Sequence, residues 1–382
     1  MKMGIKMINL IATTTFGLES CVKREIQKLG FENIKTFDGR VEFTGDETTI
    51  AKANLWLRFA SKVLIKVGEF KATTFDELFE GAKALNWGEW IPVDGKFTVT
   101  GKSVKSTLFS VSDCQAIVKK AVVEKMKEKY NVSWFDETGA DYTIQVSLLK
   151  DIATLTIDTT GGGLHKRGYR ENSMVAPLKE TLAAAMVDLS YWKRDRVLLD
   201  PLCGSGTILI EAALIARNIA PGLNRKFASE EWSRIDPSIW KQQRIDAYKA
   251  VDYDFTPTIY GSDIDKEAIY LAKENAIKAG VDDCIEFSVK PLQEVKLVGD
   301  YGCMISNPPY GERIGELKEV ESLYKDMGNL MRSNSTWGSY IITSMEYFEN
   351  LFGAKADTKR KLFNGRIKID YYQFNGPRPP RS

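Results

Sequence analysis

The sequence predicts an α/β protein, with a mostly parallel sheet in its second half and smaller α+β modules in its first half. Three observations support this prediction. After residue 163, short apolar strands alternate with helical repeats, which is the pattern of a doubly wound parallel sheet. Near the end, Asn364-Gly365 separates two strand-like runs and indicates an antiparallel hairpin. Three consecutive glycines, Gly161–Gly163, weaken both helix and strand and mark the junction between the two halves.

The composition of the chain excludes several functional classes. Its 382 residues carry a net charge of +2, so contact with a nucleic acid must come from a local basic patch. A single histidine, His165, excludes a site built from several histidines, and five cysteines without a close-spaced pair exclude a zinc ribbon. We therefore expect no metal and a reduced, cytoplasmic location. No apolar run reaches the roughly 18 residues that span a membrane.

In the first half, strand and helix patterns alternate. Thr74–Glu77 and Ser112–Gln115 each read as a capping box before a helix. Two strand patterns that meet at Lys150-Asp151 predict a hairpin. None of these elements combines a nucleophile with an acid or base, which indicates two small modules without chemistry. The predicted strands are 7–12, 41–44, 63–67, 96–104, 142–149 and 152–159, and the predicted helices are 18–29, one opened by Thr74, and one ending at Tyr130.

The second half predicts the parallel sheet and its helices. The first helix has apolar residues at helical spacing and Pro177 in its first turn. The closing hairpin places a reversed strand near one edge of the sheet. The predicted helices are 176–192, 207–217, 266–279 and 322–332, and the predicted strands are 197–199, 258–260, 285–289, 303–306, 339–343, 360–363 and 367–374.

The first candidate site is the segment 200–207, Asp-Pro-Leu-Cys-Gly-Ser-Gly-Thr, between a strand and a helix. In doubly wound sheets, ligands bind outside the carboxyl ends of the strands. Gly204 and Gly206 let the backbone approach a ligand closely, and the helix N-terminus offers N–H groups to a carboxylate. The segment is neither GxGxxG nor a phosphate loop, which requires Gly-Lys-Ser/Thr.

The second candidate site is Asp263, at the end of the next strand. A carboxylate in this place accepts hydrogen bonds from the two ribose hydroxyls of a nucleoside. Asp265 lies two residues further on, directly before a predicted helix. We expect Asp265 to cap that helix rather than to bind a ligand.

The third candidate site is Ser306-Asn307-Pro308-Pro309-Tyr310, again after a predicted buried strand. An exocyclic amine is a poor nucleophile because its lone pair is delocalised. The Asn307 side-chain oxygen and the Pro308 carbonyl can accept its two N–H bonds, which aims the lone pair at an electrophile and stabilises the developing positive charge. Tyr310 supplies a flat face for a planar substrate.

With these sites in order, the chain resembles the THUMP-containing RNA guanine-N2 methyltransferases. Segments 164–170, 176–185 and 307–313 carry the resemblance further, above all to the amino-terminal half of the bacterial bifunctional large-subunit rRNA methyltransferase and its stand-alone relatives. The resemblance implies a Rossmann-like class I methyltransferase domain with a seven-stranded sheet at 163–382. It also implies a ferredoxin-like module at 1–68 and a THUMP RNA-binding domain at 69–162.

The same resemblance implies S-adenosylmethionine as cofactor and assigns roles to residues. The group that would contact the adenine amine stays open between Gln293, Glu294 and backbone. Asn307, Pro308 and Tyr310 would act on the target amine. The cofactor-binding residues would be Asp200, Cys203, Gly204, Ser205, Gly206, Thr207, Asp263, Ile264, Leu178 and Thr181. The substrate-binding residues would be Pro309, Arg313, Lys166, Arg167 and Arg170.

Local charge adds independent support for an RNA partner. The segment 355–382 holds eight basic and two acidic residues, a net charge of +6 that leaves −4 for the rest of the chain. Such asymmetry suits a phosphate-facing rim, although a solvated face is the alternative. The basic run at 165–170 would guide RNA toward the site.

The sequence thus predicts methyl transfer to guanine N2 in RNA, with 23S rRNA or a ribosomal precursor particle as the first substrate and tRNA as the next. Asn-Pro-Pro-Tyr alone also allows adenine-N6 methylation of DNA or glutamine methylation of a protein, and the front half argues against both. An RNA-binding assembly factor with an idle site is the alternative from another class.

Overall fold

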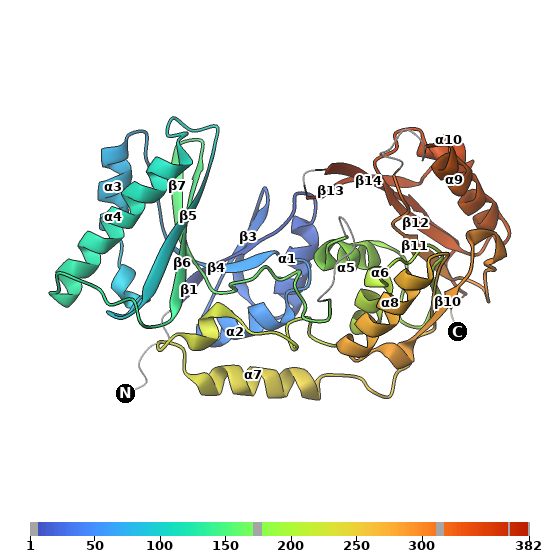
Figure 1. The fold of residues 1–382 in the computed structure, drawn as a ribbon, viewed down its shortest axis with the longest axis horizontal. Helices are drawn as coiled ribbons and strands as arrows, with labels where there is room; N and C mark the ends of the chain where they lie inside the picture. Colours follow the sequence, from blue (N-terminus) through green and yellow to red (C-terminus); the bar gives the residue numbers. More distant parts are fainter. Residues whose placement is uncertain (1–6, 171–177, 311–316, 366, 381–382) are drawn as a thin grey trace. The chain divides into compact units, whose positions relative to one another are not determined.

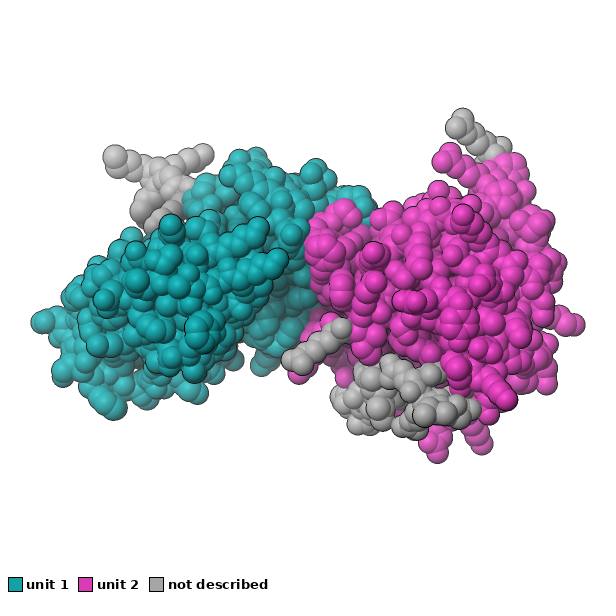
Figure 2. Space-filling view, turned by 90° about the horizontal axis from the view of Figure 1, so that it is seen from above, with its two compact units in different colours: residues 1–14, 23–164, 226–245 teal, residues 15–22, 165–225, 246–382 magenta. Residues whose placement is uncertain are grey.

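The computed structural model describes residues 7–170, 178–310, 317–365 and 367–380 (Figure 1). The chain divides into two compact units, which Figure 2 shows in different colours. Unit 1 comprises residues 1–14, 23–164 and 226–245, and unit 2 comprises 15–22, 165–225 and 246–382. Within the described part of the chain, no helix is long and apolar enough to cross a bilayer.

Unit 1 is built on one continuous seven-stranded sheet in the order β2-β3-β1-β4-β7-β6-β5. β4 joins the two halves of this sheet, because it pairs antiparallel with β1 on one side and with β7 on the other. Helices α3 and α4 cover one face of β5, β6 and β7 (Figure 1). The elements are β1 (Ile8–Thr13), β2 (Glu32–Phe37), β3 (Arg40–Gly45), α2 (Glu47–Trp56), β4 (Lys62–Lys71), α3 (Phe75–Lys83), β5 (Lys96–Val104), α4 (Val111–Tyr130), β6 (Asp141–Leu149) and β7 (Ile152–Asp158), while α1 (Glu19–Lys28) begins in unit 2 and ends in unit 1.

Unit 1 also takes in residues 226–245, which follow α6 in the sequence. Trp232 explains why this segment packs there. Its ring stacks on Tyr142 of β6 with the centroids 4.7 Å apart, and its Nε1 donates to the Asp141 carbonyl. Arg234 extends the contact, because its guanidinium lies over the Trp90 ring and pairs with Glu47. These partners are far away in the sequence, and no pattern in residues 226–245 indicates them.

Unit 2 contains the second sheet, in the order β10-β9-β8-β11-β12-β14-β13. Neighbouring strands are parallel from β10 to β12, and β14 runs antiparallel to both of its neighbours. Helices α5, α6 and α8 lie on one face and α9 and α10 on the other (Figure 1). The elements are α5 (Glu180–Leu189), β8 (Leu198–Asp200), α6 (Thr207–Ala216), β9 (Ile259–Asp263), α8 (Lys266–Ala279), β10 (Ile285–Val289), β11 (Cys303–Ser306), α9 (Leu317–Arg332), β12 (Gly338–Thr343), α10 (Phe348–Phe352), β13 (Thr358–Asn364) and β14 (Ile367–Phe374), while α7 (Pro237–Lys249) begins in unit 1 and ends in unit 2.

The fold class is confirmed: a mixed seven-stranded sheet follows the α+β elements of the first half. The predicted hairpin at Lys150-Asp151 is present, with both residues at positive φ. The capping box at Thr74 is present as well. Strands at 96–104, 285–289 and 303–306 and the helix at 266–279 have the predicted bounds.

Four local predictions were wrong or incomplete. The long helix of unit 1 begins at Val111, so Ser112 lies inside it and forms no capping box, and Ser110 makes no side-chain cap bond either. Helix α5 begins at Glu180 rather than at 176, and Pro177 lies outside the described residues. Asn364 pairs with Ile367, which moves the last hairpin's turn one residue further. Elements β2, α2, α7 and α10 were not predicted, because they are short or weakly patterned.

Candidate active site at the carboxyl edge of the unit 2 sheet

The glycine turn after β8 is shaped to receive a ligand on one side and to pack on the other. Gly204 and Gly206 have φ of +50° and +79°, in the left-handed region that favours glycine. A Cβ on Gly204 would meet nothing within 4 Å, so that side of the turn is open. A Cβ on Gly206 would lie 3.1 Å from Ala272 and Phe287, so this side packs against α8 and β10. Gly206 is the N-cap of α6 and makes no side-chain cap bond.

Asp263 is tied to this turn from the end of β9. Its Oδ2 accepts the Gly204 N–H at 2.9 Å, and its Oδ1 accepts the Asp265 N–H at 3.0 Å. Asp265 caps α8 by accepting the Glu267 N–H, as predicted. Ile264, between the two acids, is 72% exposed. A carboxylate and an exposed apolar side chain therefore stand side by side at the edge of the sheet, as a nucleoside requires.

Asp200 connects the glycine turn to the third motif. It is buried, and its Oδ1 accepts the Ser306 hydroxyl at 2.7 Å and the Leu202 N–H at 3.2 Å. Burial raises the pKa of Asp200 to about 7, and the charge of Asp263 adds to the effect. One of the two bonds to Oδ1 comes from the turn after β8, and the other comes from the last residue of β11. Asp200 thus joins the two loops on which the candidate chemistry depends.

Hydrogen bonds that the sequence motif does not indicate hold the Asn-Pro-Pro-Tyr loop. The Tyr310 hydroxyl donates to Asn307 Oδ1 at 2.6 Å. The hydroxyl of Tyr324, a fully buried residue of α9, donates to the Pro309 carbonyl at 2.9 Å and lies 2.8 Å from Thr343 Oγ1. Burial raises the pKa of Tyr324 to about 12, so its phenol keeps its proton. The signal for Tyr324 in the sequence is a buried position on an amphipathic helix, which does not tell what its hydroxyl contacts.

Arg170 braces the start of α5 against the glycine turn. Its Nη1 donates to the Leu178 carbonyl at 3.2 Å and to Thr207 Oγ1 at 3.3 Å, while Nη2 pairs with Glu180 at 2.8 Å. Leu178 and Thr181, which the resemblance places in the cofactor pocket, are both buried. These bonds hold Leu178, which lies just before α5, next to the first residue of α6.

Two arginines of the basic run at 165–170 form ion pairs inside unit 2. Arg167 is 3% exposed and pairs with Glu211 of α6 at 3.4 Å, and Tyr169 donates to the same Glu211 oxygen. Arg167 and Arg170 are thus directed into the interior of unit 2, which corrects the view of them as RNA contacts. Lys166 is exposed and remains available to an anion.

The remaining predicted site residues are Cys203, Ser205, Pro308, Pro309 and Arg313. Cys203 is buried, which raises the pKa of its thiol well above the ordinary value and makes it unreactive. Ser205 contributes backbone, since its carbonyl accepts the Asn275 amide at 3.1 Å. Pro308 is buried and Pro309 is exposed. Arg313 lies outside the described residues.

Three family models match the chain, one after another. The RlmL ferredoxin-like domain matches residues 9–64, the THUMP domain matches 72–158, and the RMKL-like methyltransferase domain matches 167–373. The chain belongs to the RMKL-like methyltransferase family. The family prediction made from the motifs is confirmed, and so is its order of domains.

Relatives of this RMKL-like methyltransferase align over almost its whole length. A putative RNA methyltransferase, YpsC, of Bacillus subtilis is 52% identical over 97% of this chain and 96% of its own. The crystal structure of a predicted N6-adenine-specific DNA methylase from Listeria monocytogenes is 50% identical, covers 98% of this chain and 97% of its own, and has a TM-score of 0.94. SMU.472, a putative methyltransferase complexed with SAH, is 45% identical, covers 98% and 99%, and has a TM-score of 0.93.

The cofactor prediction is confirmed at the level of the family, which uses S-adenosylmethionine. The residues present fit this cofactor. The turn at Gly204 is open on the side away from the core, and the N-terminus of α6 has no side-chain cap. Asp263 offers a carboxylate to ribose hydroxyls and Ile264 offers an exposed apolar side chain to a base.

Proposed function

We propose that this enzyme transfers a methyl group from S-adenosylmethionine to the N2 amine of a guanine in RNA, with 23S rRNA as the first candidate substrate and tRNA as the second. The observation that carries the proposal is the joining of the two loops by Asp200 and Ser306. This contact keeps the amide of Asn307 beside the turn that would hold the methyl donor. The THUMP match and the name of the Bacillus relative support RNA as the substrate.

The cofactor supplies an electrophilic methyl group, and the protein supplies position. Gly204, Gly206 and Asp263 would hold the donor, and Asn307 Oδ1 and the Pro308 carbonyl would accept the two N–H bonds of the target amine. That arrangement directs the nitrogen lone pair and stabilises the positive charge that develops on it. The rate enhancement would come mainly from proximity and orientation.

The acceptor oxygen of Asn307 is already oriented by one hydrogen bond. In the structure Asn307 Oδ1 accepts the Tyr310 hydroxyl, and an amide oxygen has a second lone pair that would accept an N–H of the target amine. The ring of Tyr310 would offer a face on which the flipped base stacks. Tyr324, through the Pro309 carbonyl, would keep the rest of the loop in place.

The test is nucleoside mass spectrometry of rRNA, tRNA and DNA from a strain that lacks the gene. We expect loss of N2-methylguanosine from one RNA, restored by the intact gene and not by Asn307→Ala. The purified Asn307→Ala protein should still bind S-adenosylmethionine in calorimetry, because the glycine turn and Asp263 are unchanged. Loss of N6-methyladenine from DNA instead would refute the proposal and favour the activity in the name of the Listeria relative.

An idle site is tested by the same strain and protein. If no methylated nucleoside is lost and the purified protein does not bind S-adenosylmethionine, the results favour the hypothesis that the protein is an RNA-binding assembly factor.

A further inference from the structure

The hairpin of β13 and β14 extends past the edge of the sheet that carries the candidate active site. β12 ends at Thr343, which pairs with Asp370, so residues 367–369 of β14 lie beyond the end of β12. β12 runs parallel to β11, the strand that leads into Asn307. Since neighbouring strands are about 4.8 Å apart, β14 lies roughly 10 Å from β11. The hairpin tip therefore stands beside the Asn-Pro-Pro-Tyr loop at the same edge.

One face of this tip carries two exposed lysines, and the acid that lies opposite Lys361 in the register, Asp370, pairs with Lys359 instead. The register places Lys361, Phe363 and Lys368 on one face, opposite the buried Leu362 and Ile369. Lys361 and Lys368 are exposed, and neither forms an ion pair with a described residue.

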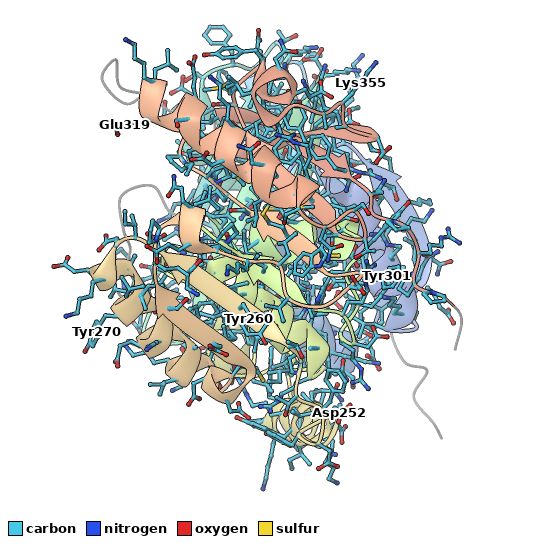
Figure 3. The ribbon with its side chains drawn as sticks, turned by 90° about the vertical axis from the view of Figure 1, so that its right-hand side faces the viewer. Asp252, Tyr260, Tyr270, Tyr301, Glu319 and Lys355 are labelled. Atoms are coloured by element: carbon cyan, nitrogen blue, oxygen red, sulfur yellow. The ribbon has the colours of Figure 1, made fainter. Side chains whose placement is uncertain are left out.

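Acids balance part of the charge further along the hairpin. Lys359, which lies further from the tip, differs from these two because it pairs with Asp370 at 3.1 Å. Lys355, just before β13, is exposed and adds to the positive charge (Figure 3).

Two aromatic rings lie next to these cations. Phe16 meets Phe363 edge to face, with the ring centroids 6.1 Å apart, and Phe16 is 54% exposed. The loop that carries Phe16 is held directly against β13. Gly17 has φ of +93°, and a Cβ there would lie 2.9 Å from the Lys361 carbonyl.

The chemistry of this surface points to unpaired nucleotides. Here one exposed ring, Phe16, and one half-buried ring, Phe363, lie beside exposed lysines. Proteins bind single strands with such combinations, because bases stack on the rings and phosphates meet the cations. A double helix would present phosphates to the lysines but no free base to the rings.

We propose that the hairpin tip, formed by Lys361, Phe363, Lys368 and Phe16, binds the single-stranded RNA that flanks the target nucleotide. The inference rests on the proposed function in one respect, that the substrate is RNA. It adds the path of the RNA, which would run from the Asn-Pro-Pro-Tyr loop, past β12, to the hairpin.

The test measures RNA binding by the full-length protein without cofactor, using fluorescence anisotropy. The probe is a labelled mixed-sequence RNA single strand, compared with a duplex of the same length. We expect Lys361→Glu/Lys368→Glu to weaken single-strand binding about tenfold. The slope of the logarithm of the binding constant against the logarithm of the salt concentration should become shallower by roughly 1.4, which corresponds to the loss of two phosphate contacts. Phe363→Leu should weaken binding about fivefold or more for the single strand and leave the duplex unaffected.

The matched control is Lys193→Glu/Lys278→Glu, which makes the same change of charge. Lys193 precedes β8 and Lys278 lies at the end of α8, so both stand at the opposite edge of the sheet. All variants should bind S-adenosylmethionine like the unchanged protein, which shows that unit 2 is folded.

Three results would overturn the inference. The first is that the hairpin variant binds RNA as the control does. The second is that the Phe363 variant loses duplex and single-strand binding equally, and the third is that polyglutamate displaces the labelled RNA as well as unlabelled RNA does. The last would make the surface a general anion site. Failure of the proposed function is distinguishable, because it is a lack of methyl transfer, which does not enter a binding measurement made without cofactor.

Discussion

Asp200 is the residue at which the cofactor turn and the acceptor loop meet. The sequence marks it as an acid at the end of a strand, and the resemblance makes it a cofactor ligand. In the structure its carboxylate is buried and receives the Ser306 hydroxyl and the Leu202 N–H. A buried carboxylate that is charged costs stability, because it has left water with few compensating bonds.

This burial predicts how stability changes with pH. The pKa of Asp200 is raised to about 7 in the folded protein from an ordinary value near 4. The folded state therefore holds the proton more tightly than the unfolded state, so the contribution of Asp200 to stability falls as pH rises through this window and levels off above about 7. Asp200→Asn removes the titration. We expect the variant to gain roughly 2–3 kcal/mol relative to the unchanged protein between about pH 5 and pH 8.

Urea unfolding of both proteins at several pH values measures this difference. Ser306→Ala is the control, since it removes a bond to the same carboxylate and keeps the titration. A difference between the Asp200→Asn and unchanged proteins that is flat across this range would contradict the raised pKa.

At the scale of elements, the turn into α6 contains two glycines with separate tasks. Gly206 packs against α8 and β10, whereas Gly204 faces open space. Both have positive φ, so alanine at either position costs about 1 kcal/mol of backbone strain. The neighbours of Gly206 must also move, because its Cβ would lie 3.1 Å from two carbons.

We therefore predict different outcomes for two matched variants. Gly206→Ala should lower the free energy of unfolding by roughly 2–3 kcal/mol, the sum of strain and overpacking. Gly204→Ala should lower the free energy of unfolding by about 1 kcal/mol. It should also weaken S-adenosylmethionine binding by more free energy than this loss of stability, because its Cβ enters the open side of the turn. Chemical unfolding and calorimetric titration measure the two effects. Equal losses of stability would show that packing at Gly206 does not matter.

The elements themselves were predicted well where local signals are strong and poorly where they are weak. Thr74 and Glu77 form the capping box that their spacing indicates, because both partners lie within one helical turn. Ser112 has the same pattern, yet the helix begins at Val111, two residues before the start that Ser112 as the N-cap would give. Buried residues such as Cys114 and Val118 anchor α4 regardless of which residue caps it. Tertiary packing thus overrode a local preference worth about 1 kcal/mol.

At the scale of the whole molecule, the division into units does not follow chain order. Residues 226–245 lie between elements of unit 2 and belong to unit 1, where Trp232 packs on Tyr142. We predict that Trp232→Ala destabilises unit 1 by roughly 3–5 kcal/mol, the usual cost of a large buried side chain. Hydrogen exchange should then speed up in β6 and remain slow in β11. Trp337→Ala, which removes a ring packed on Leu199 in unit 2, should show the opposite pattern.

Faster exchange in both sheets from either variant would mean that the units unfold together. The measurement therefore tests the division as well as the role of the indole.

The sequence by itself determined the fold class, the order of the three motifs and the chemistry that each motif allows. These features are local: a glycine turn, an acid or an Asn-Pro-Pro-Tyr loop acts through residues that are neighbours in the chain. Only the tertiary structure decided that Asp200 meets Ser306, that Tyr324 holds the Pro309 carbonyl, and that Arg167 is directed inward to Glu211. The physical reason is that burial and hydrogen-bond partners depend on residues far away in the sequence, whereas a motif records only what lies beside it.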